Sequence, residues 1–249
     1  MPSTYSYSDV ASMIDHSLLN PTLTWNHLEH GISLALAYGV ASVCIAPYAL
    51  KHCAERLRRG NSNADSKVRA STTIGFPHGV HATATKLAEV RQALADGGEE
   101  LDMVVNISKL LSGDWQYVED EIRAVVEITH AAGQKVKVIF ENAYLNDAQK
   151  IRLCEICGKL GADWVKTSTG YAPTGATDAD LILMRKHSPP SVQVKAAGGI
   201  RDLDALLRVR ALGVTRCGAT RTASMLDEAR RRLGLPVIDF REATAPHPK

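Results

Sequence analysis

Residues 164–200, WVKTSTGYAPTGATDADLILMRKHSPPSVQVKAAGGI, contain one strand, one helix and a second strand in succession. Short apolar runs lie at Trp164–Thr167 and Val192–Ala196, and a helical pattern with Thr177 as its candidate N-cap separates them. Neither run alternates strictly between apolar and polar residues, as is typical of parallel strands buried on both faces. The segment is therefore predicted to be a βαβ unit with its two strands side by side.

The same pattern recurs along the whole chain of 249 residues. Successive runs begin roughly 22 to 35 residues apart, the length of a strand, a helix and two loops. The eight candidate strands are Ile14–Leu18, Ala41–Ala46, Val68–Ile74, Leu101–Val105, Val136–Phe140, Trp164–Thr167, Val192–Ala196 and Thr215–Gly218. Eight such units predict an α/β fold, a single (β/α)8 TIM barrel over residues 1–249. An open, doubly wound parallel sheet fits the same pattern and is the alternative.

Local signals mark the ends of the predicted elements. A short helix is expected within Tyr7–Met13, before the first strand, with a polar loop at Gly60–Ser66 and a loose tail at Ala243–Lys249. Asn146 and Gln149 have the spacing of a capping box that opens a helix. Glycines that follow helical stretches are expected in the left-handed C′ conformation: Gly39, Gly97, Gly98, Gly133, Gly161 and Gly213.

Composition and charge narrow the classes of partner. Hydrophobic residues make up 45% of the chain, charged residues 22%, and the formal net charge is +2. Charges of both signs are scattered, which gives no reason to expect nucleic acid or a membrane surface as partner. Arg230–Arg232 is interpreted as a solvated helix face. The start of the chain shows no secretory signal and no run approaches the ~18 apolar residues of a membrane span, so a cytoplasmic location is expected.

The five cysteines are an odd number in a long chain and predict reduced thiols rather than a disulfide framework. Cys154 and Cys157 have the spacing of a metal or redox pair. They lie in a helical pattern without a second pair nearby, so a structural role is favoured. The nine histidines are not spaced along the sequence like the ligands of a metal ion, so no metal site is predicted.

Charged residues inside apolar strands are the strongest functional signal. Asp102, Lys137, Lys166 and Lys195 each lie between apolar neighbours of a predicted strand. Burying a charge is unfavourable by several kcal/mol unless it is paired, neutralised or used. Any one of them could be an inert ion pair, but three lysines and one aspartate cannot neutralise one another. Such an excess favours a lysine of lowered pKa and a site for an anion.

Lys166 and Lys195 occupy equivalent positions on strands that are expected to be neighbours. Equivalent positions of adjacent parallel strands lie about 5 Å apart. Two ammonium groups at this distance disfavour double charge, which pushes one of them towards the free amine that attacks a carbonyl. The sequence therefore predicts Schiff-base chemistry with one of these two lysines as the nucleophile.

Glycines and hydroxyls follow the last three predicted strands. Gly198 and Gly199 end the seventh strand, and Gly218 and Thr220 end the eighth. In barrels these two loops often hold a phosphate through backbone N–H groups, and glycine permits the close approach. The segment 167–170 adds hydroxyls directly after Lys166, which could bind substrate or cap backbone groups.

Several motifs together resemble one known family, deoxyribose-phosphate aldolase, over Ile14 to about Ala223. They are Ile14–Leu19 (IDHSLL), Val43–Pro47 (VCIAP), Ile74–Gly79 (IGFPHG), Glu100–Val104 (ELDMV), Val136–Ile139 (VKVI), Val165–Gly170 (VKTSTG) and Val194–Arg201 (VKAAGGIR).

The resemblance implies a class I aldolase that cleaves 2-deoxy-D-ribose 5-phosphate to D-glyceraldehyde 3-phosphate and acetaldehyde, without a metal or other cofactor, in deoxyribose catabolism. It implies Lys166 as the Schiff-base lysine, Lys195 as the neighbour that perturbs it and Asp102 as proton donor or acceptor. It further implies a homo-oligomer, with a dimer favoured. Supporting residues would be Asp15, Cys44, Lys137 and Thr169, and phosphate ligands would be Gly170, Gly198, Gly199, Gly218 and Thr220.

The chain departs from the family's pattern in three places. Ala46 stands where an asparagine is usual, Thr220 and Arg221 stand where serines are frequent, and residues 141–144 are unusual. These changes leave Asp102, Lys166 and Lys195 intact. They affect the shape of substrate that the site accepts and its affinity for phosphate.

Other functions fit part of the same pattern. A transaldolase-like or isomerising phosphosugar barrel and a non-catalytic phosphosugar sensor are the alternatives, and an isomerase would not need the paired lysines. Asp15 and His16 resemble part of a catalytic triad, but are interpreted as an ordinary hydrogen-bonding pair.

Overall fold

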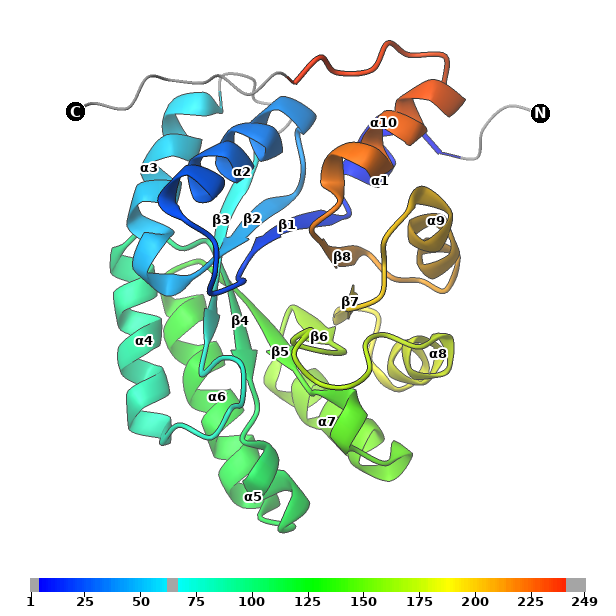
Figure 1. Ribbon diagram of the computed structural model, residues 1–249. Helices are drawn as coiled ribbons and strands as arrows, with labels where there is room; N and C mark the ends of the chain where they lie inside the picture. Colours follow the sequence, from blue (N-terminus) through cyan, green and yellow to red (C-terminus); the bar gives the residue numbers. More distant parts are fainter. Residues whose placement is uncertain (1–4, 62–66, 241–249) are drawn as a thin grey trace.

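The computed structural model describes residues 5–61 and 67–240, and its strands close into a barrel of eight (Figure 1). Neighbours pair in parallel in sequence order, and β1 pairs with β8 to close the ring. The predicted (β/α)8 barrel is confirmed, and the open sheet is excluded. The strands are β1 (Ile14–Leu18), β2 (Ser42–Ile45), β3 (Arg69–Ile74), β4 (Glu100–Val104), β5 (Lys135–Ile139), β6 (Trp164–Lys166), β7 (Gln193–Ala197) and β8 (Arg216–Ala219).

Helices surround the barrel, and their apolar faces cover the outside of the strands (Figure 1). The short helix α1 precedes β1, as predicted, and packs against α10. Between β4 and β5 the chain forms two helices, α5 and α6, where one was expected. The helices are α1 (Tyr7–Ala11), α2 (Trp25–Tyr38), α3 (Leu50–Gly60), α4 (Thr83–Ala95), α5 (Ile107–Leu111), α6 (Trp115–Ala131), α7 (Asp147–Leu160), α8 (Asp178–His187), α9 (Leu203–Ala211) and α10 (Thr222–Arg232), with 3-10 turns η1 (Pro47–Ala49) and η2 (Asn142–Tyr144).

The helix ends follow the sequence signals. Asn146 and Gln149 form the predicted capping box of α7, and Thr177 accepts the Asp180 N–H at the start of α8. Gly39 and Gly161 are left-handed C-caps, with φ of 61° and 73°. The tail expected at residues 243–249 and most of the expected loop, residues 62–66, lie outside the described residues.

Two loop glycines differ sharply in their surroundings. Gly79, in the loop after β3, has φ 69°, and a Cβ added there would lie 2.0 Å from the backbone oxygen of Val105. Gly113, between α5 and α6, has a similar φ of 76°, but an added Cβ would have no neighbour within 4 Å. The loops that follow β3 and β4 therefore touch backbone to backbone at Gly79.

All five cysteines are free and buried, as predicted for reduced thiols. Burial raises the pKa of the thiol of Cys53 to about 12 and that of Cys154 to about 11. The pKa values of the other three are also raised by burial, including that of Cys157, which lies one turn from Cys154 in α7. Within residues 5–61 and 67–240, no cluster of three or more His, Cys, Asp or Glu side chains is placed to hold a metal ion. No helix of this part of the chain is long and apolar enough to span a bilayer.

Candidate active site

Lys166 and Lys195 lie side by side inside the barrel. Their Cα atoms are register partners on β6 and β7, as the 29-residue spacing of the two positions in the sequence led us to expect. Both ammonium groups contact the same oxygen of Asp102 on β4: Oδ2 is 2.8 Å from Nζ of Lys166 and 2.7 Å from Nζ of Lys195. The carboxylate therefore lies between the two amines and bridges them.

Further charges continue this arrangement towards the other end of the barrel. Nζ of Lys137 lies 2.9 Å from Oδ1 of Asp102 and 2.5 Å from Oε2 of Glu100. Lys195 lies 2.6 Å from Oδ2 of Asp15, and Arg216 pairs with both Asp15 and Glu100. Lys166 is the last residue of β6, whereas Glu100 and Arg216 are the first residues of β4 and β8. The charges thus form a column along the barrel axis: Lys166, Asp102, Lys195, Lys137, Asp15, Glu100 and Arg216.

This charge column holds four basic and three acidic side chains, all of them buried. Three lysines and one aspartate alone would give an excess of two positive charges, but Asp15, Glu100 and Arg216 also belong to the column. The excess in the structure is one positive charge. If one lysine is neutral, the column balances, and Lys166 is the one that makes a single ion pair.

The proton affinities of the two lysines diverge. Burial lowers the pKa of Lys166; the attraction of Asp102 opposes this shift and the charge of Lys195 adds to it. Burial acts on Lys195 in the same direction, but Asp102 and Asp15 outweigh it and raise its pKa above that of a free lysine. The two pKa values therefore move apart, so Lys166 gives up its proton more readily than Lys195, and a free amine is the form that attacks a carbonyl.

Asp102 stays ionised in this setting. Burial alone would raise its pKa, but the charges of Lys137, Lys166 and Lys195 hold the pKa well below its usual value. Lys137 also stays protonated. Burial alone would lower its pKa, but the charges of Asp102 and Glu100 raise the pKa above its usual value. The pair Lys137 and Asp102 are register partners on β5 and β4, so the strands themselves fix this contact.

The predicted supporting residues Asp15, Cys44 and Thr169 have different places in the site. Asp15 is a member of the charge column. Cys44, the register partner of Ser17, lies on the inward-facing side of β2, next to the column. The pKa of the Cys44 thiol is raised, first by burial and then by the charge of Asp102. Thr169 follows β6 at the mouth, and its backbone N–H and hydroxyl both donate to Glu141.

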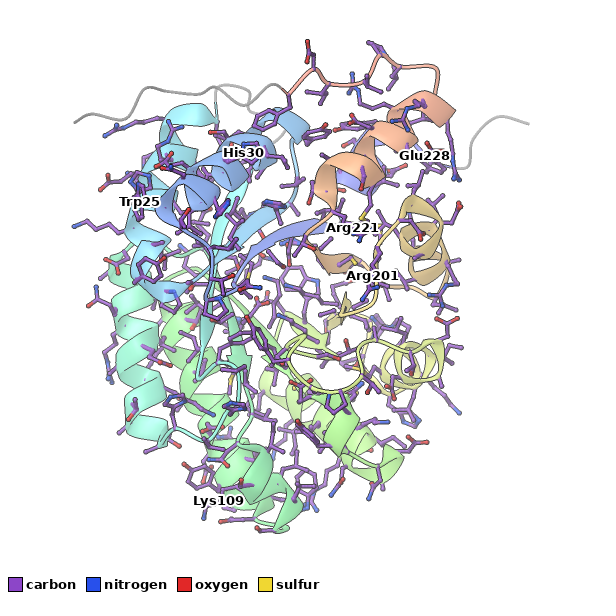
Figure 2. The ribbon with its side chains drawn as sticks, viewed as in Figure 1. Trp25, His30, Lys109, Arg201, Arg221 and Glu228 are labelled. Carbon is purple, nitrogen blue, oxygen red and sulfur yellow. The ribbon has the colours of Figure 1, made fainter. Side chains whose placement is uncertain are left out.

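The predicted phosphate ligands gather at one side of the mouth. Gly170, Gly198 and Gly199 have φ of 90°, 80° and 91°, conformations that only glycine adopts readily. Gly218 on β8 is the register partner of Ala197 on β7, so the two glycine-containing segments are adjacent. Thr220 follows β8 directly. Figure 2 shows Arg201 and Arg221 on the neighbouring loops that follow these strands.

Asp15 and His16 do not form a dyad. Asp15 faces into the barrel, whereas Nδ1 of His16 lies 2.8 Å from the hydroxyl of Thr222 at the start of α10. Burial lowers the pKa of His16 to about 4, and His30 adds to the shift. The hydrogen-bonding pair expected from the sequence is therefore wrong, because successive side chains of a strand point to opposite faces and each of these residues has other partners.

Three residues of the site have no role predicted from the sequence. Glu100 lies one residue before the predicted strand Leu101–Val105 but is the first residue of β4, and a charge beside the apolar run LDMVV is the signal that marks it. Arg216 lay inside a predicted strand and met the same criterion as the three lysines. Glu141, which is 2% exposed, follows β5 with φ 58°, and no sequence rule marks a glutamate for that conformation.

Comparison with known proteins agrees with the resemblance. The model of the family described as DeoC/LacD family aldolase matches residues 10–220. Deoxyribose-phosphate aldolase of Rhodopirellula baltica is 66% identical over 236 residues, 95% of this chain and 95% of that protein. Deoxyribose-phosphate aldolase of Thermococcus gammatolerans is 42% identical over 222 residues, 89% of this chain and 97% of the relative.

A solved structure supports the same assignment. It is the tetrameric deoxyribose phosphate aldolase from Aeropyrum pernix, which superimposes with a TM-score of 0.81 at 27% identity and covers 90% of this chain and 92% of that one. The paired lysines inside a closed barrel, the matched residues 10–220 and the identity to these relatives lead to one conclusion. The chain belongs to the DeoC/LacD family of aldolases.

Proposed function

We propose that this enzyme reversibly cleaves 2-deoxy-D-ribose 5-phosphate to D-glyceraldehyde 3-phosphate and acetaldehyde through an imine on Lys166. The observation that carries the proposal is the shared Asp102 oxygen between two lysines whose pKa values move apart. The names of the relatives from Rhodopirellula baltica and Thermococcus gammatolerans supply the substrate.

The first half of the reaction uses the neutral amine. Nζ of Lys166 attacks C1 of the open-chain sugar phosphate, and loss of water leaves a protonated imine. The protonated imine carries the positive charge that the neutral amine lacked, so Asp102 has a cationic partner at this position. The imine is the electron sink for carbon–carbon cleavage, and the proposed chemistry needs no metal or other cofactor.

The second half is proton transfer around Asp102. A proton leaves the C3 hydroxyl through a water next to Asp102, the C2–C3 bond breaks, and D-glyceraldehyde 3-phosphate departs. Because the pKa of Asp102 is low, the proton is passed on rather than kept on the carboxylate. The enamine then takes a proton at C2, and hydrolysis of the imine releases acetaldehyde. Positioned proton transfer of this kind contributes typically about 10²–10⁴-fold in rate.

The phosphate would bind at the side of the mouth formed by the loops after β6, β7 and β8. Backbone N–H groups of Gly170, Gly198, Gly199 and Gly218 and the hydroxyl of Thr220 are the proposed ligands. Binding at this remote end would fix the reacting carbons against Lys166. A catabolic role in the cytoplasm and a homo-oligomeric state, with a dimer favoured, remain predictions from the sequence.

Trapping with borohydride tests the proposal. In the presence of acetaldehyde, reduction should leave a two-carbon adduct on Lys166 and abolish activity, with the site located by mass spectrometry. Lys166→Arg should lose at least about 10³-fold in cleavage of deoxyribose 5-phosphate, because a guanidinium forms no imine at neutral pH.

The same measurements separate the alternatives. An isomerase would turn over a phosphosugar without a trapped adduct, and a sensor would show neither turnover nor trapping. A chelator should leave the cleavage rate unchanged. An adduct on another lysine, or substantial activity of Lys166→Arg, would refute the assignment.

A further inference from the structure

The loop between β6 and α8, residues 167–177, lies at the mouth of the barrel on the side of β6 (Figure 1). The hydroxyl of Tyr171 donates to the backbone oxygen of Leu19 at 3.0 Å, and its ring meets that of Phe76 edge-on, with centroids 5.5 Å apart. Leu19 follows β1 and Phe76 follows β3, the two strands that flank β2. In a closed ring of eight strands β2 lies opposite β6, so this side chain spans the opening.

One end of the loop is anchored by Glu141. The carboxylate oxygens of Glu141 accept the Thr169 N–H at 3.2 and 3.3 Å and also the Thr169 hydroxyl. The same hydroxyl oxygen accepts the N–H of Tyr171 at 3.1 Å. The hydroxyl proton and the N–H of Thr169 are thus committed to Glu141, which makes Thr169 a supporting residue.

The other end of the loop is pinned to β7. The N–H of Ala176 donates to the backbone oxygens of Ala197 and Gly198, at 3.0 and 3.1 Å. Gly175 packs so closely that an added Cβ would lie 2.4 Å from the Gly198 oxygen. With both ends fixed, residues 169–171 have a defined path shortly after Lys166, whose side chain is only 4% exposed.

Glu141, which anchors the loop, has an unfavourable backbone conformation and an unfavourable environment for its side chain. Glu141 adopts φ 58° and ψ 65°, a left-handed conformation that disfavours a residue with a Cβ. It also buries a carboxyl group, and burial raises its pKa, opposed by the hydrogen bonds from Thr169 and by the charge of Lys166. Strain and a buried acid at the mouth of a site point to a positioning role rather than to stability.

We propose that residues 169–171 are a strap over Lys166, in which Tyr171 controls access to the bound intermediate and Glu141 is the positioning residue that holds the strap in place. The inference rests on the proposed function, because the intermediate is the imine on Lys166. The strap must lift to admit the open-chain sugar. When it is closed, Tyr171 keeps solvent and bulky molecules from the imine.

Access can be measured as the rate at which cyanoborohydride inactivates the full-length enzyme at saturating acetaldehyde. Tyr171→Phe keeps the ring contact with Phe76 but loses the hydrogen bond to Leu19. We expect about fivefold faster trapping, the factor that the net strength of one hydrogen bond gives in an opening equilibrium. Glu141→Gln should also speed trapping, with the thermal midpoint recorded to check the fold.

Tyr144→Phe is the matched control. Tyr144 lies in η2, after β5, and is 49% exposed against 48% for Tyr171; within the described residues its hydroxyl has no recorded hydrogen bond. Its trapping rate should stay within about twofold of the unmodified enzyme, since no hydrogen bond is lost.

The outcomes distinguish the strap from the proposed function. If neither the unmodified enzyme nor any variant carries an adduct on Lys166, the proposed function is refuted. If the adduct forms on Lys166 but Tyr171→Phe and Tyr144→Phe are trapped equally fast, the strap is refuted. If Tyr171→Phe alone is accelerated, Glu141 does not hold the strap.

Discussion

The proton affinity of Lys166 depends mainly on three influences: burial and the charges of two neighbours. Burial is the largest influence and favours the neutral amine, Asp102 favours the ammonium, and Lys195 opposes it. The sequence suggested direct repulsion between the lysines as the main cause. The structure corrects this view: the carboxylate of Asp102 bridges the two ammonium groups, and burial contributes more than the second charge.

Removing the second lysine should change the pH dependence of the reaction. In Lys195→Leu, Lys166 loses a neighbouring positive charge, and Asp102 no longer pairs with Lys195. Both changes should raise the pKa of Lys166. The rate increases as Lys166 deprotonates, and the acidic limb of kcat/KM should therefore move about one pH unit or more towards alkaline pH. The control is Lys159→Leu, which alters an exposed lysine in α7. A limb that stays in place in both variants would contradict the coupling.

Residues of the site differed in how readily the sequence revealed them. Lys137, Lys166 and Lys195 stood out because a charge in an apolar strand must be paired or used. Tyr171 carried no such signal, because its role depends on strands that meet only when the ring closes. Glu141 was hidden for a different reason: its backbone conformation is imposed by contacts with Thr169 and not by its own preference.

Loops at the mouth of the barrel are held by close backbone contacts as well as by side chains. Gly79 brings the loop after β3 against Val105, directly after β4. The strand bounds themselves agree with the sequence to within a residue or two, because runs of buried apolar residues define them locally. The start of β4 at Glu100 differs because Glu100 is a register partner of Lys135, a pairing that the sequence around it does not show.

A methyl group at Gly79 should disrupt this contact. Gly79→Ala would need a left-handed alanine and would place Cβ 2.0 Å from a backbone oxygen, so a loop must shift. Gly113→Ala carries only the conformational penalty of about 1 kcal/mol, because its surroundings are open. We expect Gly79→Ala to lower the free energy of unfolding by about 2 kcal/mol more than Gly113→Ala, as measured by urea denaturation. Equal losses in the two variants would show that the contact is relaxed at little expense.

The charge column connects distant parts of the molecule. Its members come from β1, β4, β5, β6, β7 and β8, so the barrel closes around a set of ion pairs as well as an apolar core. The strand–helix repeat was readable from the sequence because each unit is local. The composition of the column was not, because contacts such as that of Arg216 with Glu100 join residues more than a hundred positions apart.

Breaking the column at Arg216 should destabilise the whole barrel. Arg216→Met would leave Asp15 without its guanidinium partner and Glu100 with Lys137 as its one buried partner. Loss of one member of a buried pair lowers stability by about 3–5 kcal/mol. The comparison variant is Arg231→Met, which removes an exposed pair with Glu228 and should change stability by less than about 1 kcal/mol. Similar denaturation midpoints for the two variants would show that water or a neighbour takes over the role of Arg216.

The burial of every native thiol has a practical consequence for labelling. Only a thiolate reacts readily with maleimides and similar probes, and none of the five cysteines is both accessible and easily ionised. A single cysteine placed on the outer surface, for example at the exposed Ser112, would therefore carry a fluorophore selectively in the folded enzyme. The native cysteines could stay in place, so the labelled molecule would keep its natural interior.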